Sequence, residues 1–249
     1  MKIFDSHFHI IDFDFPIIEN NGYNPPAYTV DDYNVTKEEL NIVGGAVVSG
    51  SYHGYDQSYL ISALEKLGPN FVGVSHLPAA ISDSRILQLN DSGIQAVRFN
   101  IEQGGSAKLD QLQYFSDRIY DLVGWHTELY IDSKEIKDIL PILKRIKKVS
   151  IDHLGISKEG LPNLYKFVEN GGYVKASGFG RVDFDVEKVM KEIYDIRPDA
   201  LMFGTDLPST RAKTVFDKKD INHIKNVFDK DQLNKIMYEN AYNFYFEGK

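Results

Sequence analysis

The segment KIFDSHFHI, residues 2–10, is the first of eight short runs that are rich in apolar and β-branched residues. Runs of this kind are typical of buried strands. The other seven cover residues 44–50, 71–77, 93–101, 126–132, 147–155, 171–178 and 200–208. Because helical segments separate most of these runs, they predict a parallel sheet, and eight units favour closure into a (β/α)8 TIM barrel. An open, doubly wound α/β sheet is the alternative at this level.

Segments with helical periodicity lie between the runs. In residues 56–67 the apolar stripe of an amphipathic helix is formed by Tyr59, Leu60, Ala63, Leu64 and Leu67. Similar patterns cover residues 108–123, 134–145, 159–170, 186–196 and 231–244. Thr36, followed three residues later by Glu39, predicts a capping box at the start of the first helix.

The connection after the first run is unusually long. Residues 11–35 are polar, aromatic and rich in turn formers, and loops of this length usually cover a functional site. Its aromatic residues favour a packed segment, and they include Phe13, Phe15, Tyr23 and Tyr28. We therefore expect a single domain over residues 1–249, with this first βα loop acting as a lid.

Composition limits the class of protein. The chain of 249 residues is 43% hydrophobic, which is enough for a full core, and it has no cysteine, which excludes disulfides and thiolate chemistry. A formal net charge of −8 disfavours nucleic acid and anionic membranes as partners and leaves a small-molecule substrate. We see no signal peptide and no apolar stretch of roughly 20 residues, and so expect a soluble, cytoplasmic protein. The sequence leaves open whether it is a monomer or a homo-oligomer.

Polar side chains recur toward the carboxyl ends of the predicted strands, where barrels place catalytic groups. Asp5, His7 and His9 alternate, so we expect them on one side of the first strand. His153 lies late in the sixth run and Asp206 late in the eighth. Each has an ordinary explanation, such as a structural histidine or a helix cap. Their coincidence at one end of three strands favours a shared catalytic site of His7, His9, His153 and Asp206.

Other side chains at this end are candidates for substrate binding. Arg98, Lys175 and Arg181 could hold a carboxylate, or could pair with an internal acidic residue instead. Glu128 and Tyr130 share one face of the fifth strand. The full set of candidates is Arg98, Tyr130, Arg181, Lys175, Glu128 and His53.

The chemistry of these residues allows two alternatives. In the first, Asp206 takes a proton from water and the imidazoles stabilise the developing oxyanion, so that no cofactor is required. In the second, His7, His9 and Asp206 hold one divalent metal ion, for which imidazole and carboxylate ligands suit zinc or manganese. Such an ion would polarise a carbonyl and lower the pKa of water.

Several stretches, in order along nearly the whole chain, resemble the amidohydrolase superfamily. They are DSHFHI (5–10), GYNPPAYTVDDY (22–33), HGYDQSYLISAL (53–64), GIQAVRFN (93–100), GWHTELYID (124–132), IDHLG (151–155), GTDLP (204–208) and NAYNFYF (240–246). Within the superfamily the chain looks most similar to the lactonase branch, which is typified by 2-pyrone-4,6-dicarboxylate lactonase.

The resemblance implies a (β/α)8 barrel that hydrolyses a cyclic ester. It assigns water activation to Asp206 and places His7, His9 and His153 around the substrate carbonyl. By the same resemblance, Arg98, Tyr130 and Arg181 would bind carboxylate and hydroxyl groups of the substrate. We therefore expect a hydrolase that opens a small lactone, carboxylated or derived from a sugar.

Two departures from the family pattern affect this expectation. The segment NIEQGG (100–105) lacks the second arginine that the dicarboxylate lactonases use after strand 4, which argues against a pyrone dicarboxylate substrate. The strand 4 lysine and strand 5 histidine of binuclear amidohydrolases have no match either, which argues against a two-metal site. The alternative is a mononuclear metal-dependent amidohydrolase or decarboxylase with His7, His9 and Asp206 as ligands, and a non-enzymatic binding barrel is a third hypothesis.

Overall fold

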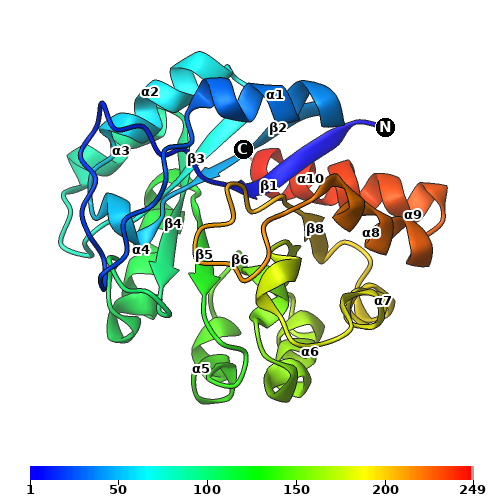
Figure 1. Ribbon diagram of the computed structural model, residues 1–249. Coiled ribbons are helices and arrows are strands. Elements are labelled where there is room, and N and C mark those ends of the chain that lie inside the picture. Colours follow the sequence, from blue (N-terminus) through cyan, green and yellow to red (C-terminus); the bar gives the residue numbers. More distant parts are fainter. Residues whose placement is uncertain (248–249) are drawn as a thin grey trace.

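The computed structural model describes residues 1–247 and contains an eight-stranded sheet whose strands follow one another in chain order. All seven neighbouring pairs are parallel. The strands are β1 Ile3–Phe8, β2 Ile42–Val48, β3 Phe71–Ser75, β4 Ile94–Asn100, β5 His126–Tyr130, β6 Val149–Ile151, β7 Tyr173–Ala176 and β8 Leu201–Phe203. Every predicted run overlaps one of them, although β2 begins two residues before its run, and Figure 1 shows helices around the outside of the sheet. The predicted (β/α)8 TIM barrel is confirmed.

The helices lie around the barrel, most of them on its outer face. They are α1 Val30–Leu40, α2 Ser58–Leu67, α3 Asp83–Asp91, α4 Leu112–Val123, α5 Ile136–Leu143, α6 Leu161–Glu169, α7 Val186–Ile196, α8 Ile221–Val227, α9 Lys230–Asn234 and α10 Asn240–Phe246. The sequence did not predict α3 and α8. The predicted capping box was also wrong, because Thr29 caps α1 with Asp32 as its reciprocal partner. Among residues 1–247, no helix combines the length and apolar character that spanning a membrane requires.

The ends of the sheet meet just beyond β8. The backbone N–H of Asp206 donates to the carbonyl of His7 at 2.7 Å, and the N–H of His9 donates to Leu207 at 2.7 Å. Gly204 permits this approach, since a Cβ at that position would lie 2.8 Å from the backbone nitrogen of His7. The segment after β8 is thereby bonded to the carboxyl end of β1, so that residues from opposite ends of the chain become neighbours.

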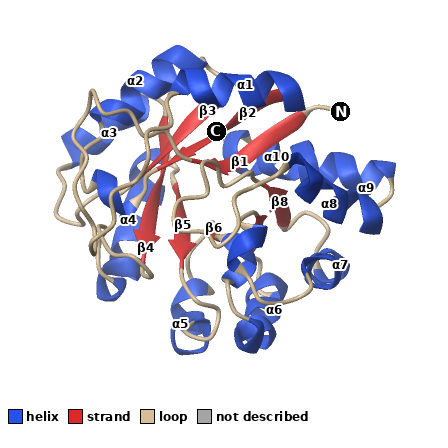
Figure 2. Cartoon of the chain, viewed as in Figure 1, coloured by secondary structure: helices blue, strands red, loops and turns tan. Residues whose placement is uncertain are grey.

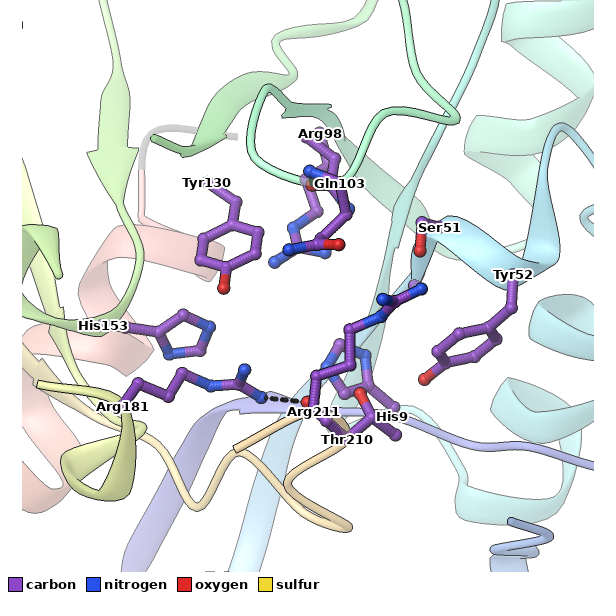
Figure 3. Close-up of a pocket in the computed structure, with 12 residues that line it drawn as sticks. His9, Ser51, Tyr52, Arg98, Gln103, Tyr130, His153, Arg181, Thr210 and Arg211 are labelled. Carbon is purple, nitrogen blue, oxygen red and sulfur yellow. Dashed lines mark hydrogen bonds between the residues drawn. The ribbon is translucent and has the colours of Figure 1, made fainter. Parts of the chain in front are cut away.

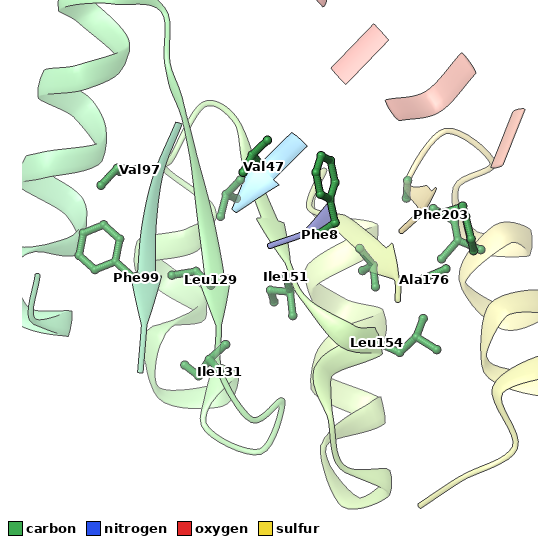
Figure 4. Close-up of a cluster of buried hydrophobic side chains, with 14 of the residues drawn as sticks. Phe8, Val47, Val97, Phe99, Leu129, Ile131, Ile151, Leu154, Ala176 and Phe203 are labelled. Atoms are coloured by element: carbon green, nitrogen blue, oxygen red, sulfur yellow. The ribbon is translucent and has the colours of Figure 1, made fainter. Parts of the chain in front are cut away.

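Two apolar layers hold the barrel together. The larger lies between the strands and the surrounding helices, and Figure 4 shows part of it, including Phe8, Val97, Leu129 and Phe203. The smaller fills the barrel interior near the starts of the strands, where Phe4 and Met202 meet Phe244 of α10. Helix α10 therefore closes the amino end of the barrel, and polar side chains are left to occupy the other end.

Strand β1 departs from the simple alternation that the sequence suggests. The pairing of β1 with β2 shifts register between Asp5 and Phe8. The Asp5 carboxylate accepts hydrogen bonds from Tyr33 of α1 at 3.1 Å and from the Thr205 hydroxyl at 2.7 Å. Asp5 therefore faces the outer layer, and the expectation that it shares a side with His7 and His9 was wrong. The register shift is the physical reason.

The first βα loop, drawn in tan between β1 and α1 in Figure 2, is closed on itself and attached to the barrel. Ile11 and Tyr28 exchange two backbone hydrogen bonds of 2.7 and 2.8 Å at its base. The N–H of Ile18 donates to the carbonyl of Tyr52 at 2.9 Å, beyond the end of β2. Packing is uneven, because Phe13, which we expected to pack, is 63% exposed. That the loop acts as a lid stays a prediction.

Candidate active site

Four polar residues converge at the carboxyl end of the barrel, as the sequence predicts. His7 lies near the end of β1, His9 directly follows that strand, His153 follows β6, and Asp206 follows β8. The Nε2 atoms of His7, His9 and His153 lie 3.9, 3.8 and 3.8 Å from the same atom, Oδ1 of Asp206. All four side chains are buried. These separations are too long for hydrogen bonds and leave room for one small group between them.

Two of these residues have strained backbones. Asp206 has φ of 61° and His153 has φ of 52°, in the left-handed region that side chains other than glycine seldom adopt. Each such residue costs on the order of 1–3 kcal/mol and persists only where its surroundings enforce it. Strain of this kind clusters at functional sites, so the backbone independently supports a functional role for this end of the barrel.

The hydrogen-bond partner of His9 defines its chemical form. Its Nδ1 lies 2.7 Å from the carbonyl oxygen of Val48, which can only accept, so Nδ1 carries a proton. Burial holds the pKa of His9 well below its usual 6.5, and the ring is therefore neutral near pH 7. Nε2 then presents a lone pair toward Asp206. His9 can accept a hydrogen bond or bind a metal there, but it cannot donate a proton.

His7 lies above a buried network of charges. Its Nδ1 is 3.3 Å from Asp152 Oδ1 and 3.3 Å from the Lys175 ammonium, which also forms an ion pair with Glu128. Burial would raise the pKa of Asp152, but the attraction of His7, Lys175 and Arg98 outweighs it and holds that pKa well below its usual value. Burial lowers the pKa of His7 itself. Its Nε2 is buried and has no hydrogen-bond partner within residues 1–247.

Two arginines enter the site, each paired with a carboxylate. Arg98 donates from Nε and Nη2 to Asp152 Oδ2 at 3.1 and 2.8 Å, and from Nη1 to the carbonyl of Ser49. Arg181 donates from Nε to Asp206 Oδ2 at 2.7 Å and from Nη2 to Oδ1 at 3.1 Å. Burial disfavours the charge of Arg181, but Asp206 outweighs burial and raises its pKa.

A cavity of about 320 Å³ opens over these residues. Figure 3 shows the side chains of Arg98, Tyr130, His153 and Arg181 on one side of it and Tyr52 on the other. The lining residues are His9, Gly50, Ser51, Tyr52, Arg98, Asn100, Gln103, Tyr130, His153, Arg181, Thr210 and Arg211. The polar character of this lining suits a small, polar ligand.

The candidates for substrate binding divide into two groups. Arg98, Tyr130 and Arg181 line the cavity, as expected. Glu128 and Lys175 do not, because they are fully buried below it and pair with each other. Glu128 also accepts hydrogen bonds from Tyr245 at 2.6 Å and from His126 at 3.0 Å.

His53 does not line the cavity either. Its ring stacks on Tyr59 of α2, with ring centroids 3.7 Å apart, and burial lowers its pKa to about 3. Its Nδ1 accepts the backbone N–H of Gly50 at 3.0 Å. The structure thus places His53 in the packing between β2 and α2, which differs from our expectation for it.

Among the residues of the site that sequence reasoning missed, two are charged. Asp152 immediately precedes His153, and its place at the end of β6 was a usable signal. Arg211 lies in the irregular segment after β8, where no periodicity indicates the direction of a side chain. Among the residues that the structure describes, two groups have ligand atoms within 4.8 Å of one another and could hold a metal ion: His7 with His9 and Asp206, and His7 with Asp152 and His153.

The chain also matches known proteins. A family model described as amidohydrolase matches residues 4–246. A 2-pyrone-4,6-dicarboxylate hydrolase of Comamonas testosteroni is 23% identical over 237 residues, which cover 84% of this chain and 77% of that protein. A 4-sulfomuconolactone hydrolase of Hydrogenophaga intermedia is 24% identical over 225 residues, which cover 82% and 74%.

Solved structures show the same fold. A probable 2-pyrone-4,6-dicarboxylic acid hydrolase from Acinetobacter baumannii, crystallised with citric acid bound, superposes with a TM-score of 0.84 at 24% identity. The match covers 98% of this chain and 99% of that one. A structure from Agrobacterium tumefaciens gives a TM-score of 0.85 at 18% identity and covers 98% and 95%.

Proposed function

The chain belongs to the amidohydrolase family, and on that premise we propose that it is a hydrolase that opens a small lactone. The observation that carries this proposal is the convergence of three imidazole Nε2 atoms, 3.8–3.9 Å away, on one carboxylate oxygen beneath a small cavity. The two curated relatives described above are named as hydrolases of a pyrone dicarboxylate and of a sulfomuconolactone, whose rings are cyclic esters.

In the proposed reaction, Asp206 and His9 orient the attacking water. Both present lone pairs to the same space. A single water molecule can therefore donate one hydrogen bond to Asp206 Oδ1 and its second hydrogen bond to His9 Nε2. Asp206 takes one proton from the water while the water oxygen forms a bond to the lactone carbonyl carbon. The ester C–O bond of the ring then breaks, and the departing ring oxygen takes the proton back from Asp206.

The carbonyl oxygen gains negative charge during this attack and needs donors. The Nδ1 of His153 lies 3.0 Å from the Ser177 hydroxyl, which can donate to it and so place a proton on Nε2. Nδ1 of His7 lies 3.3 Å from both the Lys175 ammonium and Asp152 Oδ1, and in the form that accepts from Lys175 the ring carries its proton on Nε2. We assign His7 that form in the proposed reaction. His7 and His153 thus act as the oxyanion donors, while His9 acts as an acceptor. Arg98, Tyr130 and Arg181 bind polar groups of the substrate.

The same residues fit a single divalent metal ion. His9 presents a lone pair, His7 Nε2 is buried without a partner within residues 1–247, and the ligand atoms of His7, His9 and Asp206 lie within 4.8 Å of one another. When bound there, zinc or manganese would polarise the carbonyl and lower the pKa of water. This favours, as a second candidate, a mononuclear metal-dependent amidohydrolase or decarboxylase.

Turnover against a panel of lactones, measured as acid release with and without a chelator, tests both candidates. Ring opening that survives the chelator supports the metal-free lactonase. Activity that the chelator abolishes and zinc or manganese restores supports the metal-dependent enzyme. A chain that releases no acid from any lactone, in either condition, would contradict the proposed lactone hydrolysis.

A further inference from the structure

Three arginines line the cavity, but only two are neutralised by an acidic partner. Arg98 pairs with Asp152 and Arg181 pairs with Asp206. For Arg211, no carboxylate oxygen lies within 4.0 Å of the guanidinium in the part of the chain that the structure describes. Among the described residues, 1–247, no acidic side chain lines the cavity. Arg211 is therefore the uncompensated positive charge of this cavity.

The Arg211 side chain is held in place by neutral groups. Its Nη2 donates to the backbone carbonyl and, at 3.0 Å, to the side-chain oxygen of Asn20 in the first βα loop. Its guanidinium lies 4.2 Å from the centre of the Tyr23 ring, in cation–π contact. The backbone of Arg211 adopts φ of 62°, which is strained for arginine. The loop and the strain fix its position without cancelling its charge.

The remaining donors of Arg211 are available to a ligand. Within residues 1–247, Nε and Nη1 make no hydrogen bond to the protein. Figure 3 shows the guanidinium directed toward Ser51, on the side of the cavity away from His153. A ligand whose reacting carbonyl lies at Asp206 would therefore extend its other end toward Arg211.

We propose that Arg211 binds a carboxylate group of the substrate, remote from the bond that is cleaved, and so selects acidic lactones over neutral ones. This inference rests on the proposed lactone hydrolysis for its kinetic test. A charged donor in a cavity with no competing acid favours an anionic ligand, since hydrogen bonds between ionised partners are about twice as strong as neutral ones. The binding role makes Arg211 a determinant of specificity and leaves the chemistry to Asp206.

The test compares a lactone bearing a carboxylate with its uncharged carboxamide counterpart. For Arg211→Gln we expect KM for the acidic lactone to rise about 10- to 100-fold, because a hydrogen bond to a charged group contributes on the order of 1.5–3 kcal/mol. We expect kcat to stay within a few-fold, and both constants for the amide to stay near wild type. Arg211→Lys retains the charge and should recover part of the preference.

Lys213→Gln is the matched control, because Lys213 is exposed in the same segment and its loss changes the net charge equally. It should leave both substrates unaffected. If Arg211 only anchored the first loop, Arg211→Gln would impair the acid and the amide alike. That outcome, or an unchanged preference for the acid, would overturn the assignment.

A binding measurement separates this inference from the proposed function. Benzene-1,3-dicarboxylate cannot be hydrolysed, and calorimetry should show that it binds wild type and Lys213→Gln but binds Arg211→Gln at least 10-fold more weakly. If wild type bound this probe through Arg211 but opened no lactone, the proposed function would fail and the anion site would stand. Equal binding by wild type and Arg211→Gln would remove the anion site whatever the activity.

Discussion

Two layers of buried polar side chains lie inside the barrel, and they differ in how far their hydrogen-bonding groups are satisfied. In the lower layer, which comprises Glu128, Lys175, His126 and Tyr245, Glu128 accepts from all three partners. In the upper layer, which comprises His7, His9, His153 and Asp206, the three Nε2 atoms stand 3.8–3.9 Å from Asp206 and make no hydrogen bond within residues 1–247. Burial of charge therefore does not by itself mark a site here. The unmet hydrogen-bonding capacity of the upper layer does.

The largest expected effect is the loss of catalysis when Asp206 of the upper layer is replaced. Asp206→Asn keeps the size of the side chain and an oxygen for Arg181, but the amide cannot take a proton from water. We expect kcat to fall about 10³-fold, as is typical for loss of a general base. Lactone turnover measures this effect, and thermal unfolding should show a melting temperature close to wild type. Near-normal turnover would remove Asp206 from its proposed role.

The next effect concerns the stability of the lower layer. Lys175→Met leaves Glu128 as an uncompensated buried charge, and loss of one partner of a buried ion pair costs about 3–5 kcal/mol. The free energy of unfolding, measured by urea denaturation, should fall by about this amount. The double variant Lys175→Met/Glu128→Gln removes both charges and should lose less than the single variant.

A surface pair provides the control for this comparison. Lys147 lies 3.3 Å from Asp121, and both side chains are more than half exposed. Lys147→Met should change stability by less than about 1 kcal/mol, because water screens exposed ion pairs. If Lys175→Met lowered the free energy of unfolding no more than Lys147→Met does, the ion pair of Lys175 with Glu128 would not stabilise the fold as we expect.

The sequence predicted the fold well because every strand is buried and most of them form short runs rich in apolar and β-branched residues. It also predicted the upper layer, since barrel topology brings the carboxyl ends of parallel strands together whatever their separation in the chain. The direction of Asp5 was wrong, because a register shift in β1 leaves no trace in the alternation of residue types. The boundary of α1 was missed because Thr29 with Asp32 has the same spacing as Thr36 with Glu39.

Depth along a strand limited the prediction of substrate-binding residues. Lys175 and Glu128 point into the barrel, as expected for polar residues on parallel strands, but they lie one layer below the cavity and neutralise each other. A sequence pattern gives the side of a strand but not whether a charge finds its partner within the protein. Arg211 could not be predicted for a related reason, because its direction depends on contacts with Asn20 and Tyr23 nearly 190 residues earlier in the chain.

The smallest expected effect is the pH dependence that the lower layer contributes. Burial lowers the pKa of His126 to about 4, despite its contact with Glu128, whereas an unfolded histidine titrates near 6.5. As the pH falls below about 6.5, the unfolded chain therefore takes up a proton before the folded chain does, and stability is lost. Between pH 7.5 and 5.5 this loss amounts to about 1 kcal/mol for His126.

His126→Gln can still donate to Glu128 but does not titrate, so its unfolding free energy should decline less steeply than that of wild type by this amount. Urea denaturation at both pH values measures the difference, and parallel pH profiles for variant and wild type would show that His126 is not held neutral in the lower layer.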